Sequence, residues 1–512
     1  MELYHNQVTR VEGAFSLRMF HRSWGLMLIQ SNIRAPSTLL DFPTLERFVE
    51  EITANRYDVV GISAIQPNVG KVRKMCELVR EHLPEATIVV GGHVSNLRTL
   101  AEEIDADHIV KGEGVRWMRR FLGEDEHRPI RHPHILSGIG TRMMGVAPRE
   151  KPGDVAATLI PSVGCPMGCN FCATSAMFGG KGKFVHFYET GDELFEVMCE
   201  LEEAMQVKSF FVMDENFLLH KKRTLRLLDL MVDHGKPWAL YVFSSANVLR
   251  QYTIDQLVAL GVSWVWMGLE GENASYTKLK GTDTHDLVGL LQSRGIRVLG
   301  STIIGLEDHT PENIDATIDY AVSHNTEFHQ FMLYTTVAGT PLYREHLEND
   351  TLLDRDECPD ADRHGQYRFS HKHPHFAPGQ EKELILKAFR RDFTANGPSI
   401  VRVARTMLRG WKRYKHHSDM RIRRRVRWES RDLPVSMAAL LWAAKRWFGT
   451  DPMLKRNIGS VLKELYREFG LKARLAGPIG GRYVRFMMRR EDRRLRRGWT
   501  YEPTTFCETA NQ

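Results

Sequence analysis

The sequence predicts an α/β protein with an open parallel sheet, then a six-stranded partial barrel, then a basic helical region. Short apolar runs alternate with amphipathic helical stretches over residues 1–345, and small or polar residues follow most of these runs. Strands that alternate with helices form parallel sheets. The chain has 512 residues, 42% hydrophobic and 26% charged, which is enough for two or three folded domains.

The first predicted domain covers residues 1–145. Apolar, β-branched runs at Tyr57–Ser63, Thr87–His93 and His108–Lys111 predict parallel strands, and Val69–Leu83 predicts a helix between the first two. Gly25–Ile29 is typical of the start of a helix, so an earlier strand of this sheet is hard to find.

Small and polar residues follow these three strands. Open parallel sheets bind ligands at the carboxyl ends of their strands, and glycines there let the backbone approach a large flat ligand. The residues that we expect at such a site are Ser63, Gly91, Gly92, Gly112 and Glu113.

A second strand–helix rhythm covers residues 150–345. Its amphipathic helices include Asp192–Met205 and Ile254–Leu260. The predicted strands are Ala157–Ile160, Ser209–Met213, Leu240–Phe243, Trp264–Leu269, Val298–Ile304 and Phe331–Thr335. Six such units predict a parallel (β/α)6 partial barrel, with its active site at the carboxyl ends of the strands.

Three cysteines with the spacing CxxxCxxC, Cys165, Cys169 and Cys172, follow the first barrel strand. Thiolates suit iron–sulfur clusters, and three of them leave the fourth iron of a cubane open for a small molecule. A zinc site usually shows a second Cys or His pair at short spacing, and none follows here. The other four cysteines are far apart, which favours a reducing compartment over a disulfide scaffold.

This cysteine run, with Phe171 just before its last member, resembles the radical S-adenosylmethionine (SAM) superfamily. The order DVVGIS, VVGGH and KGEG within residues 25–120 resembles the Rossmann-like cobalamin (B12)-binding domain of its B12-dependent members, which include methyltransferases and anaerobic Mg-protoporphyrin ester cyclases. The Asp-x-His-x-x-Gly motif of other B12 proteins is absent, so His93 is not predicted as a cobalt ligand. A Rossmann-like domain without a cofactor is the alternative.

The resemblance implies a [4Fe-4S] cluster on Cys165, Cys169 and Cys172, SAM on its open iron, and cobalamin in the first domain. It places near SAM or substrate Phe171, Gly179, Gly180, Asp214, Ser244, Glu270 and Gly305. Glu270 and Tyr334 are the candidate catalytic residues for proton transfer. Each polar residue in this set also fits a loop cap or a solvated charge.

The rest of the chain divides into a connecting segment, 346–400, and a basic region, 401–512, with 28 Lys and Arg against 10 Asp and Glu. Trp and Tyr lie among the arginines, and the apolar block Met437–Trp442 precedes Lys445, Arg446 and Trp447. We expect an amphipathic helical surface that contacts anionic lipid, with Trp442 and Trp447 inserted. RNA binding is a weaker alternative. A third interpretation is a solvated helical cap that covers the barrel and binds no partner.

Four histidines, His364, His371, His373 and His375, lie near Cys358, so both a metal site and a plain surface loop are open interpretations. The sequence shows neither a signal peptide nor an apolar run of about 18 residues. We therefore expect a cytoplasmic protein, peripheral to the inner face of the membrane if the basic region binds lipid.

These features predict a radical SAM enzyme, specifically a cobalamin-dependent C-methyltransferase for a hydrophobic or lipid-like substrate, with a flavodoxin- or ferredoxin-type electron donor. A radical SAM oxidoreductase or cyclase with the same domain order is one alternative. A non-catalytic iron–sulfur protein that binds RNA or membrane is another. Bound cobalamin, SAM cleavage and a methylated product discriminate among the three.

Overall fold

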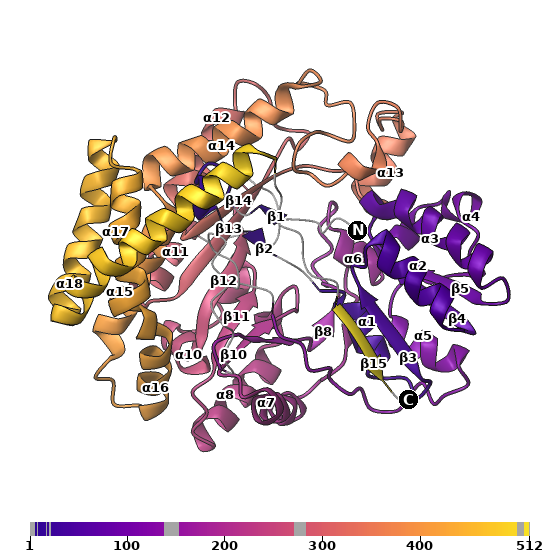
Figure 1. Ribbon diagram of the computed structural model, residues 1–512, viewed down its shortest axis with the longest axis horizontal. Coiled ribbons are helices and arrows are strands. Elements are labelled where there is room, and N and C mark those ends of the chain that lie inside the picture. The colour runs from indigo at the N-terminus through magenta and orange to yellow at the C-terminus, as the bar shows by residue number, and fades with distance from the viewer. Residues whose placement is uncertain are drawn as a thin grey trace.

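The computed structural model describes residues 6–7, 9–16, 18–19, 22–137, 153–270, 283–498 and 506–510. Figure 1 shows an N-terminal domain on one side, a six-stranded sheet in the middle and the C-terminal helices on the other side. This order confirms the predicted fold class. The predicted boundary at 145–150 lies outside the described residues, and the division into four regions stays a prediction.

The N-terminal domain contains a parallel sheet in the order β4-β5-β6. The predicted strands are confirmed, because apolar β-branched side chains such as Ile88 and Val90 are fully buried between helices. The strands and helices of this domain are α1 (Trp24–Gln30), α2 (Leu45–Ala54), β4 (Val59–Ser63), α3 (Val69–His82), β5 (Thr87–Gly91), α4 (Leu100–Glu103), β6 (His108–Ile109) and α5 (Gly114–Phe121).

One strand of this domain pairs with the end of the chain. β3 (Ser37–Asp41) lies outside the three-stranded sheet and pairs antiparallel with β15 (Phe506–Ala510), as Figure 1 shows. The sequence analysis predicted neither strand. The pairing joins segments more than 450 residues apart, so no local pattern indicates it.

The barrel sheet has six parallel strands in the order β14-β13-β12-β11-β10-β7. All six predicted strands and both named helices are confirmed. The strands are β7 (Ala157–Leu159), β10 (Ser209–Val212), β11 (Ala239–Phe243), β12 (Val262–Gly268), β13 (Arg297–Ile304) and β14 (Phe328–Leu333). The helices are α7 (Gly191–Met205), α8 (Lys221–Asp233), α9 (Ala246–Leu249), α10 (Ile254–Leu260), α11 (Thr284–Ser293), α12 (Ile314–Ser323) and α13 (Pro341–Glu348).

Alternate strand residues face opposite sides of this sheet. Phe210, Leu240 and Val265 pack with the helices of the outer layer, including α7 and α8. Their sequence neighbours Phe211 and Trp264 pack instead with the C-terminal helices. The inner face of the partial barrel is therefore covered, in part, by the end of the chain.

The C-terminal region is helical, as expected. Its helices are α15 (Ser399–Tyr414), α16 (Met420–Glu429), α17 (Ala438–Trp447) and α18 (Pro452–Arg496), and α18 is kinked at Gly470. A further helix, α14 (Gln380–Asn396), precedes them in the connecting segment. The apolar block Met437–Trp442 does not form the expected lipid-facing surface, because Met437, Leu441 and Trp442 are buried in the core under the sheet. The prediction that Trp442 inserts into lipid is therefore wrong.

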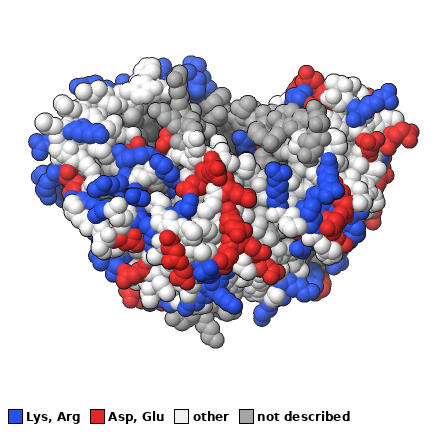
Figure 2. All heavy atoms as spheres, turned by 90° about the horizontal axis from the view of Figure 1, so that it is seen from below, with Lys and Arg blue, Asp and Glu red and all other residues white. Residues whose placement is uncertain are grey.

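The arginine-rich stretch Arg421–Arg427 is also partly internal. Arg421 donates to the carbonyl of Ala259, and Arg425 donates to that of Val258, so both side chains hold α16 against α10. In Figure 2 the exposed Lys and Arg gather on the side where Figure 1 places the C-terminal helices, and a column of acidic side chains lies near the centre. In the described parts of the chain, no helix is both long and apolar enough to cross a bilayer.

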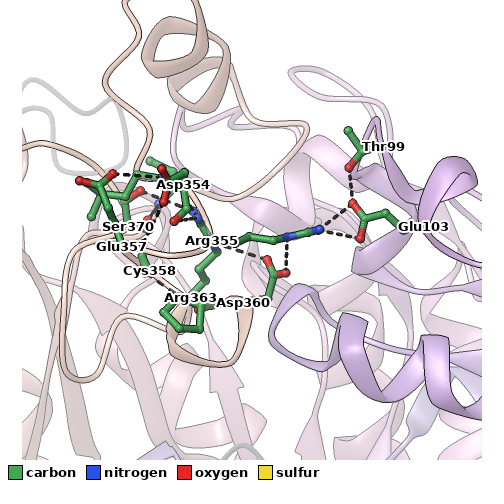
Figure 3. Close-up of polar contacts among 12 residues, drawn as sticks. Thr99, Glu103, Asp354, Arg355, Glu357, Cys358, Asp360, Arg363 and Ser370 are labelled. Atoms are coloured by element: carbon green, nitrogen blue, oxygen red, sulfur yellow. Dashed lines mark hydrogen bonds and ion pairs between the residues drawn. The ribbon is translucent and has the colours of Figure 1, made fainter.

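The segment after α13 binds the N-terminal domain (Figure 3). Arg355 donates to both carboxylate oxygens of Glu103 in α4, at 2.7 and 2.6 Å, and also pairs with Asp360 at 2.8 Å. Thr99 and Arg73 bind the same Glu103 from within its own domain. Burial opposes the charge of Glu103, but hydrogen bonds from Arg355 and Thr99 prevail and lower its pKa. This contact fixes the N-terminal domain against the end of the barrel.

Candidate functional site

The three motif cysteines lie in the loop between β8 (Ser162–Val163) and α6 (Ala173–Met177). They are free thiols and are partly buried. The backbone N–H of Cys172 donates to the Cys169 carbonyl at 3.1 Å, and the Ser175 hydroxyl donates to the Cys165 carbonyl at 2.8 Å. The loop is thus shaped by its own hydrogen bonds.

Glycines let the following segment pack on this loop. Gly168 has φ 65°, and a Cβ there would lie 2.5 Å from the Cβ of Lys181. The N–H of Gly182 donates to the Pro166 carbonyl at 2.8 Å. Gly179 and Gly180, predicted to contact SAM, both have positive φ in this supporting turn. Their contact with SAM stays a prediction.

The thiols influence one another. Burial raises the pKa of Cys165 to about 11, and the neighbouring Cys172, Cys169 and Glu215 add to the shift. Among the described residues, no three His, Cys, Asp or Glu side chains converge as ligands of a single metal ion. A cubane differs from a single ion because each thiolate binds a different iron, so separated thiols in one loop fit its donor set.

Phe171 and Tyr334 meet beside the cysteine loop. Tyr334 is buried at the end of β14 with Leu306 and Leu342, and Phe171 packs against this small cluster. The N–H of Leu342 also donates to the Asn170 carbonyl at 3.1 Å. Two residues that were predicted from different motifs therefore share one apolar contact at the carboxyl end of the barrel.

The acidic turn after β10 holds two neighbouring carboxyl groups with different surroundings, and the predicted role of Asp214 toward SAM or substrate stays a prediction. Asp214 is buried and fully engaged: it accepts hydrogen bonds from Arg223 at 2.9 Å, from the Asn216 N–H at 3.1 Å and from the Ser162 hydroxyl. In the described residues, the Oε2 of the adjacent Glu215 is buried without a hydrogen-bond partner. Burial, followed by the charge of Asp214, raises the pKa of Glu215 to about 8.

The other predicted barrel residues lie at strand ends, as expected. Ser244 after β11 donates to the side chain of Asn216 at 3.1 Å. Glu270 is buried two residues after β12, next to Gly271, which lies outside the described residues. Gly305 after β13 has φ 81°, and the ring of Phe369 occupies the space of a Cβ. Their roles toward SAM or substrate stay predictions.

The strand ends of the N-terminal domain face α6, the helix that follows the cysteine loop. A Cβ at Gly112 would lie 3.9 Å from the carbonyl oxygen of Met177 in α6. Asn96 after β5 lies 3.9 Å from the Met177 sulfur and packs against Gly339 of the barrel. The edge of the sheet that we expect to bind a ligand thus adjoins the segment that follows Cys172.

Two of the residues predicted at this edge have clear structural roles. Glu113 caps α5 by accepting hydrogen bonds from the N–H groups of Val115 and Arg116. Gly92 has φ 82°, and a Cβ there would lie 2.5 Å from the Ala64 carbonyl oxygen. Gly91 has more room, because the nearest atom to its Cβ position is 3.7 Å away. Ser63 at the end of β4 lies beside Gly92.

The sequence analysis missed a histidine pair beside Tyr334. The rings of His346 and His371 lie 4.4 Å apart, and the Tyr334 ring is 5.7 and 5.1 Å from them. Burial lowers the pKa of His371 to about 3, so this ring is neutral. His371 belongs to the histidine-rich stretch, but His346 lies on α13 and has no motif around it.

Two family models match the chain, the B12 binding domain over residues 23–122 and the Radical SAM superfamily over residues 159–321. An uncharacterized methyltransferase of Pyrococcus horikoshii is 23% identical over 330 residues, which cover 58% of this chain and 71% of that protein. The anaerobic magnesium-protoporphyrin IX monomethyl ester cyclase of Rubrivivax gelatinosus is 23% identical over 387 residues, 67% of each chain.

A solved structure is also similar. It is the radical S-adenosylmethionine methyltransferase TsrM from Kitasatospora setae with cobalamin and a [4Fe-4S] cluster bound. The TM-score is 0.49 at 18% sequence identity, and the match covers 75% of this chain and 90% of that one.

Proposed function

The chain joins a B12-binding domain to a radical SAM domain, as B12-dependent radical SAM enzymes do, and we propose that it is a cobalamin-dependent C-methyltransferase that cleaves SAM. The observation that carries the proposal is the close approach of Gly112 and Asn96 to Met177. It brings the edge at which we expect cobalamin beside α6, the helix that directly follows the cysteine loop of the other domain. Two cofactors that must act on one substrate need this proximity.

The residues present fit both cofactors. Cys165, Cys169 and Cys172 would hold the [4Fe-4S] cluster, and the buried carboxylate of Glu215 beside them suits the amino group of SAM. In the described chain, the buried Nδ1 of His93 at the end of β5 has no hydrogen-bond partner, which suits a polar group of cobalamin other than the cobalt. When bound, these cofactors supply radical formation and methyl transfer.

The chain's own residues would orient the substrate and exclude water. Phe171, Leu306 and Tyr334 form an apolar wall beside the cysteine loop. On the inner sheet face, Met213, Phe243 and Trp266 stand near the carboxyl ends of three adjacent strands and are only partly buried. The rings of Phe243 and Trp266 stack 4.9 Å apart. This apolar, aromatic surface supports a hydrophobic or lipid-like substrate.

The test is anaerobic reconstitution of the full chain with iron, sulfide and hydroxocobalamin. We expect a corrinoid spectrum, an iron–sulfur absorbance, and formation of both S-adenosylhomocysteine and 5′-deoxyadenosine. A cyclase, which the Rubrivivax relative makes the second candidate, would cleave SAM without a methylated product. A protein that binds the cluster but never cleaves SAM would contradict both proposals.

A further inference from the structure

The second half of α18 carries its large apolar side chains on the outside. After the kink at Gly470, five residues spaced four, four, four and three apart lie on one side of the helix. Their exposed fractions are 75% for Leu471, 59% for Leu475, 67% for Ile479, 58% for Tyr483 and 60% for Phe486. We call these five residues the outer stripe. A helix of a globular protein ordinarily turns such a stripe inward.

The inner face of the same helix consists mostly of small residues. Ala473, Gly477 and Gly481 are buried, and a Cβ at Gly481 would lie 2.5 Å from the Trp442 ring in α17. Small residues let two helices approach closely, so α17 is packed without any help from the outer stripe. The stripe is therefore not needed by the fold, and its exposure calls for a partner outside the chain.

Positive charge surrounds the outer stripe. Residues 471–498 contain ten Lys and Arg and two acidic residues. Lys472, Arg474, Arg482 and Arg489 are exposed among the apolar side chains. The combination of an apolar stripe, a tyrosine and flanking arginines matches an interfacial helix.

We propose that the outer stripe of α18 docks the enzyme on an anionic lipid bilayer. Lipid supplies both an apolar layer for Leu471, Leu475 and Ile479 and negative headgroups for the arginines. A second copy of the chain is a poorer occupant, because a symmetric contact would bring two strongly basic helices together. RNA would match the arginines but not the aliphatic side chains, since bases stack on aromatic rings.

The docking also bears on the substrate. Combined with the proposed methyl transfer, on which this part of the inference rests, it assigns a membrane-resident lipid as the substrate class. The docking itself does not depend on that chemistry. The surface differs from the one expected at Trp442, which is buried.

The experiment is flotation of the full-length protein with vesicles of phosphatidylcholine, alone or mixed with phosphatidylglycerol. Wild-type protein should float with the anionic vesicles and much less with the neutral ones. Leu475→Ser/Ile479→Ser should weaken anionic binding by about tenfold or more, because both side chains lose their burial in the interface. Arg482→Gln/Arg489→Gln should weaken binding at low salt and reduce its salt dependence.

The matched control is Leu45→Ser/Val232→Ser, which removes two apolar side chains of similar exposure from α2 and α8 and should bind as wild type does. Anionic binding by Leu475→Ser/Ile479→Ser equal to wild type would overturn the proposal. If wild-type protein is a dimer and the Leu475→Ser/Ile479→Ser variant is a monomer, the outer stripe binds a second copy of the chain instead. RNA that displaces the protein from anionic vesicles at a concentration below that of the lipid would also overturn the proposal.

The outcome is separable from that of the proposed function. Both serine variants should retain the corrinoid spectrum and SAM cleavage of wild type, because the outer stripe touches neither cofactor site. If wild-type protein binds vesicles but lacks SAM cleavage, the proposed function fails and the docking stands. If SAM cleavage is intact and wild-type protein does not float with vesicles, the docking proposal fails and the proposed function stands.

Discussion

At the scale of single residues, the motif cysteines differ from the other described thiols in their surroundings. Cys165 is influenced by Cys169 and Cys172, whereas Cys76 is buried in the apolar core of the N-terminal domain and Cys199 lies on α7 beside Lys236. Only the first set offers several thiols to one ligand.

We predict that Cys165→Ala, Cys169→Ala or Cys172→Ala abolishes the iron–sulfur absorbance and the formation of 5′-deoxyadenosine, because each change removes one thiolate. The control is Cys199→Ala, which should keep both signals. Anaerobic spectroscopy and product analysis measure the effect. A triple alanine variant that still produced 5′-deoxyadenosine would refute the cluster assignment.

His132 lies between the N-terminal domain and the barrel, and it binds Ile160 just after β7 and before the cysteine loop. Its Nε2 accepts a hydrogen bond from the Ile160 N–H at 2.9 Å, so the proton lies on Nδ1, which faces the Pro133 carbonyl at 2.7 Å. Burial lowers the pKa of His132 from 6.5 to about 4. Protonation would place two N–H groups against each other.

The pH dependence follows from this shift. Because the folded-state pKa is depressed, the contribution of His132 is complete above pH 6.5 and is lost as the pH falls toward about 4. The loss is on the order of 3 kcal/mol.

We predict that His132→Gln shows a shallower loss of Tm than wild type between neutral and mildly acidic pH. His127→Gln, at an exposed site, should follow wild type; parallel curves for all three would exclude a role for His132.

At the scale of elements, substitutions of Gly91 and Gly92 at the carboxyl end of β5 distinguish a glycine that the fold requires from one that a ligand requires. Gly92→Ala should destabilise the N-terminal domain by about 1–3 kcal/mol, because alanine is strained at positive φ and its Cβ would meet Ala64. Gly91→Ala should leave the domain folded, since its Cβ position makes only an ordinary contact.

Bulkier side chains extend this test. Gly91→Leu should reduce cobalamin binding while the iron–sulfur content is retained, because the side chain would fill the expected ligand site. The control is Gly61→Ala in β4, where nothing lies within 4 Å of the added Cβ. Corrinoid absorbance and thermal unfolding are measured on each variant. Full cobalamin binding by Gly91→Leu would place the cofactor elsewhere.

At the scale of the whole molecule, Arg355 joins the segment after the barrel to α4. We predict that Arg355→Ala speeds hydrogen exchange in residues 99–104 and 354–370. The free energy of local opening should fall by about 1 kcal/mol, because Arg355 donates to both carboxylate oxygens of Glu103 and Glu103 is mostly buried. Arg73→Ala is the matched control, because Arg73 binds the same carboxylate from within the N-terminal domain. Equal exchange in both variants would show that Arg355 does not hold the domains together.

The sequence by itself determined the order of the domains, the six barrel strands and the cysteine loop. These features depend on local periodicity and on short spacing along the chain, as in Ser209–Met213 or Cys165–Cys172.

Only the tertiary structure decided the rest. It engaged Asp214 with Arg223 and left Glu215 beside the cysteines, brought His346 to Tyr334, and paired β3 with β15. It also buried Trp442 and turned Leu475 outward, although both lie in apolar stretches among arginines. Which face of a helix is covered depends on neighbours distant in sequence, because burial is set by packing across the whole molecule and not by the segment alone.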